Sequence, residues 1–211
     1  MEVLCGLTED ELKKKLKRKL DEKRYIHSVG VAYTAVSLVM RHAGIDKLED
    51  GGAELINLAY TAGLLHDCAK CLEDDERDKL CRSLKVDVSD FEREYPYLIH
   101  AKLGAALAEK KYGVTDERIL NAIRYHTTGR AGMSFLEAVI FSADFIEPHR
   151  KPLIVMPAAR AALYEDLDYG VYVILKQTLK HLANKGQAVE EHTLEAYEYY
   201  ASLCSKKLKE A

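Results

Sequence analysis

The segment from Ala53 to Leu65 is almost entirely apolar or small, and His66 and Asp67 follow it directly. A helix that is apolar on every face has to be buried, because none of its faces suits water. We expect this segment to form the central helix of the fold and to carry His66 and Asp67 into the interior. Neighbouring side chains on a helix point about 100° apart, so a single site can use both residues only near the helix end.

The His66-Asp67 pair suits metal chemistry. Asp67 can bridge two cations through its two carboxylate oxygens, and neutral His66 can give one ring nitrogen to one of them. A bridging carboxylate beside an imidazole is what a two-metal hydrolytic centre requires. With 8 histidines in 211 residues, a His-Asp pair can also arise by chance. Whether this pair belongs to a metal site therefore depends on the other candidate ligands in the sequence.

The remainder of the chain predicts an all-α fold of about ten helices, with no convincing strand pair or repeat. Capping boxes of the form Ser/Thr-x-x-Glu begin at Thr8, Ser89 and Ser134. Other predicted helices cover residues 21–41, 53–65, 73–84, 97–112, 116–125, 158–165, 168–184 and 192–209. Among the predicted breaks are Gly44, a polar loop at 47–52, Pro96, Gly113 and a linker bounded by Pro152 and Pro157.

Composition narrows the class of protein. A chain of 211 residues can bury one sizeable core. Its formal charge of -3 makes long nucleic acids improbable partners, although a local basic pocket could bind a small anion. Five cysteines, with no signal peptide and no apolar run of about 18 residues, predict a cytoplasmic protein without a membrane span. The spacing of Cys68 and Cys71 is better explained by packing than by a redox or zinc site.

Four further residues are candidate ligands. His27 lies on the apolar stripe of its helix and faces inward, where a lone histidine would more often be a hydrogen-bonded core residue. His100 lies in the first turns of its helix, and His126 lies at the polar exit of another. Asp144 stands within a strongly apolar run, so its carboxylate needs a cationic partner, for which a metal or an Arg would serve.

The ordered set His27, His66-Asp67, His100, His126 and Asp144 resembles that of the HD-domain metal-dependent phosphohydrolases. Four segments are more narrowly similar to the YqeK family: Arg24 to Val31, Leu64 to Lys70, Tyr125 to Arg130 and Ser142 to Arg150. The resemblance spans about residues 20 to 200. It implies one HD domain over 1–211, with a motif core at about 20–150 and C-terminal helices at 157–209 that complete a nucleotide pocket.

The resemblance also implies an activity, the symmetrical hydrolysis of diadenosine tetraphosphate to two ADP. His27, His66, Asp67 and Asp144 would hold one divalent metal, and the bridging Asp67, His100 and His126 would hold a second. The family favours iron, although manganese, zinc or cobalt would suit the same ligands. A metal-bridging hydroxide would attack phosphorus in line, which makes Asp67 and His66 the expected catalytic residues.

Groups next to these ligands in sequence are candidates for holding the substrate. The candidates for phosphate oxygens are Arg24, Lys70, Thr127, Arg130 and Arg150. Arg24 and Arg130 could equally be surface charges. His192, at the start of the last helix, is expected near the nucleotide base. The settings of His42, His149 and His181 do not suggest ligands, so we expect them to be structural or exposed.

Three alternatives share parts of this pattern. An HD nucleotidase that acts on mononucleotides or guanosine tetraphosphate would have the same ligands, and an HD-type di-iron oxygenase would have the same metal cluster. A non-catalytic nucleotide sensor or helical interaction module would be expected to lose ligands, whereas all six are present. The sequence leaves a monomer and a homodimer both open.

Overall fold

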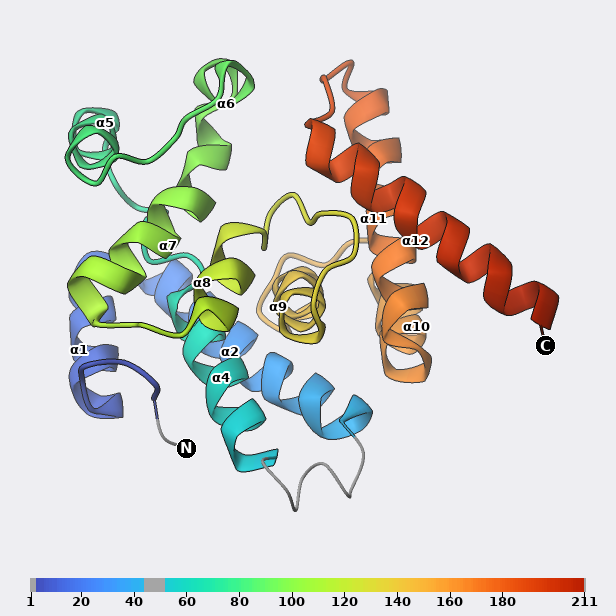
Figure 1. Ribbon diagram of the computed structural model, residues 1–211, viewed down its shortest axis with the longest axis horizontal. Helices are drawn as coiled ribbons and strands as arrows, with labels where there is room; N and C mark the ends of the chain where they lie inside the picture. The colour runs from blue at the N-terminus through green and yellow to red at the C-terminus, as the bar shows by residue number, and fades with distance from the viewer. Residues whose placement is uncertain (1–2, 44–51, 211) are drawn as a thin grey trace.

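A computed structural model describes residues 3–43 and 52–210 of the chain (Figure 1). The predicted stop at Gly44 and nearly all of the predicted loop at 47–52 lie outside these residues. No helix in the described ranges is both long enough and apolar enough to cross a membrane.

Within residues 3–43 and 52–210 the secondary structure is helical, with no strand, so the all-α prediction of about ten helices is confirmed. The helices are α1 (Glu9–Lys19), α2 (Glu22–His42), α4 (Gly52–Leu65), α5 (Asp74–Ser83), α6 (Asp90–Glu94), the 3-10 helix η1 (Pro96–Leu98), α7 (Ile99–Tyr112), α8 (Glu117–Arg124), α9 (Phe135–Ile146), α10 (Met156–Glu165), α11 (Leu167–Asn184) and α12 (Glu191–Glu210).

Local sequence signals set most helix ends. Capping boxes form at Thr8, Ser89 and Ser134, where the hydroxyl accepts a backbone N–H and the Glu three residues later bonds back to the cap. Gly113 ends α7 in the left-handed conformation, with a φ of 74°, which glycine adopts without a Cβ clash. These predicted boundaries are confirmed.

The linker prediction is wrong at one residue. Pro157 lies inside the first turn of α10, which begins at Met156, rather than in the preceding linker. A proline is tolerated there because the first N–H groups of a helix have no carbonyl partner within the helix.

Helix α4 is the centre of the bundle, as predicted from its uniform apolarity. Leu58, Leu64 and Leu65 are completely buried, and α4 packs against α2, α8 and α9 (Figure 1). A Cβ on Gly63 would lie only 2.6 Å from the Cα of Ala32, so the backbones of α4 and α2 touch at this glycine. The end of α4 at Leu65 therefore lies deep in the protein, and His66 and Asp67 follow it there.

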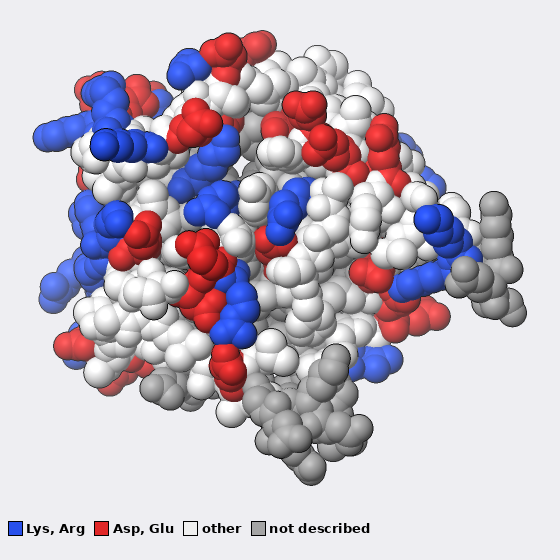
Figure 2. Space-filling view, viewed as in Figure 1, with Lys and Arg blue, Asp and Glu red and all other residues white. Residues whose placement is uncertain are grey.

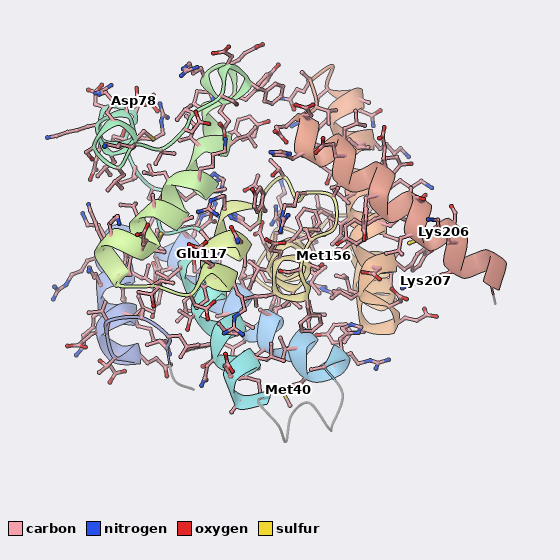
Figure 3. All side chains as sticks on the ribbon, in the orientation of Figure 1. Met40, Asp78, Glu117, Met156, Lys206 and Lys207 are labelled. Atoms are coloured by element: carbon pink, nitrogen blue, oxygen red, sulfur yellow. The ribbon has the colours of Figure 1, made fainter. Side chains whose placement is uncertain are left out.

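The C-terminal helices form a second group beside this bundle. Helix α11 packs against α9, and α10 and α12 pack against α11. Lys207 on α12 pairs with Asp166 and Asp168 at the start of α11, at 2.8 and 3.0 Å. Figure 3 shows Lys206 and Lys207 at the opposite end of the molecule from Asp78 on α5.

Charged residues on the face shown in Figure 2 are mixed in sign. Basic side chains gather at the left edge of the view, over α1 and α5, but acidic side chains lie among them. The side chains of Glu73, Asp74, Asp75 and Glu76 at the start of α5 are all exposed, so this acidic run is solvated.

Candidate metal centre

The structure brings all six predicted ligands together from five parts of the chain. His27 comes from α2, His66 and Asp67 from the end of α4, His100 from the start of α7, His126 from the turn after α8, and Asp144 from α9. The first five are buried, whereas the Asp144 side chain is 20 % exposed. The centre is therefore closed on most sides and open beside Asp144.

The two carboxylate oxygens of Asp67 face different histidines. Its Oδ2 lies 3.3 Å from Nε2 of His66 and 3.6 Å from Nε2 of His27. Its Oδ1 lies 3.2 Å from Nε2 of His100 and 3.6 Å from Nε2 of His126, and it makes no hydrogen bond within the described structure. A buried carboxylate oxygen without a hydrogen-bond donor is costly unless a cation compensates it.

Asp144 adds a second carboxylate on the His27 side. Its Oδ1 lies 3.0 Å from Nε2 of His27 and 3.9 Å from Nε2 of His66. The ligand atoms of His27, His66 and Asp144 all lie within 4.8 Å of one another, and so do those of His66, Asp67 and His126. His66 thus belongs to both groups and lies between them.

Hydrogen bonds set the tautomers of the histidines. In His66, His100 and His126, Nδ1 lies 2.6 to 2.7 Å from the backbone carbonyl oxygen three residues earlier. A carbonyl only accepts, so each Nδ1 carries the proton and each Nε2 keeps a free lone pair. In His27 the acceptor is instead a carboxylate oxygen of Glu147, at 3.0 Å from Nδ1.

These lone pairs point at one another. The Nε2 atoms of His27 and His66 are 3.2 Å apart, and those of His100 and His126 are 3.1 Å apart. Two nitrogens without protons repel at this distance, whereas a cation bound by both would be stabilised. The donor set of imidazole nitrogens and carboxylate oxygens therefore fits divalent metal ions.

The protonation states of His100 and Asp67 agree with a role as ligands. Burial lowers the pKa of His100 to about 4 against the opposing effect of Asp67, so its imidazole is neutral near pH 7. Burial opposes ionisation of Asp67, but the histidines around it hold its pKa well below the usual range. The centre therefore presents an ionised carboxylate and a neutral imidazole at neutral pH.

Glu147 is a functional residue that the sequence analysis missed. It is completely buried; Oε1 accepts from His27, and Oε2 accepts the backbone N–H of His149 at 2.7 Å. A Cβ on Gly30 would lie 2.5 Å from Oε2, so the absence of a side chain there makes room for the carboxylate. Its sequence signal was a glutamate three residues after Asp144, between Ile146 and a proline.

Two of the predicted phosphate-binding arginines contact ligand carboxylates. Arg24 Nη1 lies 2.5 Å from Oδ2 of Asp67, and Arg150 Nη1 lies 2.9 Å from Oδ1 of Asp144. Arg150 also donates to the backbone oxygen of Asp144, at 2.6 Å. The Arg partner considered for Asp144 is thus present together with the histidines.

Lys70 and Thr127 also reach the centre. Lys70 Nζ lies 3.2 Å from both ring nitrogens of His100. Thr127 Oγ1 lies 3.2 Å from Nε2 of His100 and 3.1 Å from Nε2 of His126. Both groups therefore lie directly beside the predicted ligands His100 and His126.

Arg130 and His192 lie further out, around Tyr125. Arg130 Nη2 contacts both carboxylate oxygens of buried Glu137 at 2.9 Å, and its guanidinium lies over the ring of Tyr125. His192 contacts the edge of the same ring and pairs with Glu195 at 3.3 Å. Within the described chain, neither has a hydrogen bond or ion pair with the six ligands.

The two CxxC cysteines are free thiols with different settings. Cys68 is buried, and its Sγ lies 3.5 Å from the backbone oxygen of Gly104. Half-buried Cys71 donates to Asp21 at 3.4 Å. The packing interpretation is confirmed for Cys68.

A recess of about 420 Å³, which we call the first recess, opens from the centre toward α11. It is lined by His126, Thr127, Phe141, Asp144, Phe145, Arg150, Lys151, Leu153, Ile174, Gln177, Thr178 and His181. Its lining combines four apolar side chains, Phe141, Phe145, Leu153 and Ile174, with polar and charged groups, and such a combination suits a small organic molecule that has polar substituents. His181, which was expected to be structural or exposed, lines this recess.

Comparison with known proteins agrees with this architecture. The profile of the HD domain family matches residues 24–203. The chain belongs to the HD-domain family. It is 36% identical to the symmetrical bis(5'-nucleosyl)-tetraphosphatase of Bacillus subtilis, over 89% of this chain and 94% of that protein. The protein of the same name from Staphylococcus aureus is 35% identical, over 90% of this chain and 93% of that one.

A solved structure supports the same assignment. The predicted HD superfamily hydrolase involved in NAD metabolism from Clostridium acetobutylicum superposes with a TM-score of 0.83 at 36% identity, covering 93% of this chain and 98% of that one. The resemblance to HD-domain phosphohydrolases of the YqeK family is thereby confirmed, and this HD-domain protein belongs to a family of hydrolases.

The first prediction concerns the Asp67 carboxylate. Asp67→Asn keeps the shape of the side chain but removes the charge that faces both histidine pairs, so metal content after purification should fall by at least about tenfold. Elemental analysis by mass spectrometry would measure it, with circular dichroism to verify folding. Asp90→Asn, at an exposed side chain, is the control. Wild-type metal content in Asp67→Asn would contradict the assignment.

The second prediction concerns Glu147. Glu147→Gln can still accept a hydrogen bond from His27 but loses the negative charge, so metal affinity should fall about 10- to 100-fold, as is typical for such partners of metal ligands. Chelator competition would measure the dissociation constant. Glu137→Gln is a matched control, because Glu137 is also buried but contacts Arg130 instead of a ligand. Equal losses in the two variants would show a general effect on folding.

Proposed function

We propose that this protein hydrolyses diadenosine tetraphosphate, and related dinucleoside polyphosphates, symmetrically to nucleoside diphosphates. One observation carries the proposal: the two oxygens of buried Asp67 face two separate histidine pairs, which suits a dinuclear hydrolytic centre. The relatives that share 35 to 36% identity over nine-tenths of the chain are named for this activity.

We assign two divalent metals to the centre. His27, His66, Asp67 and Asp144 would hold the first, and Asp67, His100 and His126 the second. Bound cations would neutralise phosphate oxygens and lower the pKa of a water molecule at the centre. We propose iron from the family resemblance, with manganese, cobalt or zinc compatible with the same donors.

The protein's own side chains would then position the phosphates. The guanidinium groups of Arg24 and Arg150 lie at the edge of the centre, on the ligand carboxylates. A guanidinium offers a planar pair of N–H donors that matches two phosphate oxygens. Lys70 and Thr127 add an ammonium and a hydroxyl on the side of His100. We therefore assign phosphate binding to these four of the six predicted substrate contacts.

The first recess is our proposed site for one nucleoside. Phe145 and Ile174 would cover the faces of the base, and Gln177 offers an amide that can both donate to and accept from its edge. The recess lies between the motif core and α11, which supports our proposal that the C-terminal helices complete the nucleotide pocket of a single HD domain. The predicted contacts of Arg130 and His192 with substrate stay predictions.

The setting of the reaction is part of the same proposal. We infer a cytoplasmic protein that acts on small nucleotides rather than on nucleic acids or membranes. The absence of a membrane-spanning helix from the described residues is compatible with this inference. A homodimer stays an open prediction.

The third prediction concerns the position of the cut. Purified metal-loaded protein should convert diadenosine tetraphosphate to ADP alone, because the proposed phosphate contacts would hold the bond between the second and third phosphates at the centre. In oxygen-18 water, attack by water places one label in one ADP per turnover, which chromatography with mass spectrometry would detect. ATP and AMP as main products would contradict symmetrical cleavage, and activity on mononucleotides alone would favour the nucleotidase alternative.

The fourth prediction concerns Arg150. Arg150→Lys keeps the charge but loses the planar pair of donors, so the KM for diadenosine tetraphosphate should rise about tenfold, or the cut should move. Steady-state kinetics with product analysis would measure both effects. Arg82→Lys, at an exposed position on α5, is the matched control. Wild-type affinity and products in Arg150→Lys would contradict the assigned role.

A further inference from the structure

A second recess, which we call the basic recess, opens on His27. Its volume is about 380 Å³. It is lined by Asp21, Lys23, Arg24, His27, Glu147, His149, Arg150 and Lys151. It shares Arg150 and Lys151 with the first recess, so the two meet beside Asp144. The metal centre therefore has two openings of different chemistry.

The acidic residues of the basic recess are already engaged. Asp21 caps α2 by accepting the backbone N–H of Arg24 at 2.8 Å, and it also accepts from Cys71. Glu147 is completely buried against His27. Their charges are therefore partly compensated before any ligand arrives.

The two lysines of the basic recess form no ion pair with the other described residues. The side chains of Lys23 and Lys151 are exposed, and no ion pair joins either to another described residue. Unlike the first recess, the basic recess has no phenylalanine, tyrosine or aliphatic side chain in its lining. Such a surface suits a polyphosphate chain rather than a nucleobase.

We propose that the basic recess binds the phosphates of the second nucleoside diphosphate, the half that leaves when the tetraphosphate is cut. This inference rests on the proposed function and deepens it. The first recess would read one nucleoside, and Lys23, Arg24 and Lys151 would hold the two phosphates beyond the cut. A symmetrical substrate is then bound asymmetrically, and the second nucleoside contributes little to recognition.

Lys23 is the residue to change, because it lines only the basic recess. Lys23→Glu reverses one charge there, and Lys23→Gln removes it. Lys79→Glu makes the same change at an exposed lysine on α5 and is the control. Two measurements apply: the KM for diadenosine tetraphosphate, and the number of ADP molecules bound per metal-loaded chain in equilibrium dialysis.

Wild-type chains should bind two ADP, one in each recess, and Lys23→Glu should bind one. The KM should rise about fivefold in Lys23→Gln, the scale of one partly exposed charge contact, and further in Lys23→Glu. The loss should grow from diadenosine triphosphate to the pentaphosphate, because more phosphates follow the cut. A merely structural effect would not depend on phosphate number.

Two results would overturn the inference: one ADP per wild-type chain, or wild-type KM and stoichiometry in Lys23→Glu. Failure of the proposed function looks different, because wild-type protein would then produce no ADP from the tetraphosphate. The dialysis measurement does not need turnover and judges the basic recess in either case.

Discussion

The Asp67 carboxylate is held in the interior of the protein with four imidazole nitrogens directed at it. Taking a carboxylate out of water is costly, and although Arg24 contacts Oδ2 of this one, its Oδ1 accepts no hydrogen bond from any described residue. Helix α4 ends directly before His66 and Asp67. The polar pair therefore occupies a helix terminus and does not interrupt the apolar contacts of α4 with α2, α8 and α9. The placement of the other ligands follows from this geometry.

Much of this arrangement could be predicted from the sequence, because its signals are local. Capping boxes and Gly113 mark helix ends through contacts within a few residues, and an apolar segment such as 53–65 has only the interior to occupy. Five of the six ligands were predicted in short motifs that resemble those of a known family, and His100 was predicted from its place in the ordered set of histidines and aspartates. Their mutual approach could be expected only through that resemblance, since spacing alone does not bring α2, α7 and α9 together.

Contacts between segments that are far apart in the sequence could not be predicted from it. Glu147 reaches His27 across 120 positions, and its function depends on the space left by Gly30. Gln177 and His181 enter the first recess only because α11 packs on α9. The partners of Arg130 and Arg150 likewise depend on side-chain direction, which neither composition nor periodicity specifies. Function near a motif was therefore easier to predict than function supplied by a remote helix.

Gly63 contributes both to the packing of two helices and to the orientation of a predicted metal ligand, His66. Its missing side chain lets the backbones of α2 and α4 touch, and its carbonyl oxygen accepts the Nδ1 proton of His66, which leaves Nε2 free for the metal. Any substitution that widened the helix contact would also move the acceptor that orients this histidine. A substitution of Gly63 would therefore affect both the packing of α4 on α2 and the orientation of His66. The stability of the bundle could not be changed at this position without also changing the chemistry of the site.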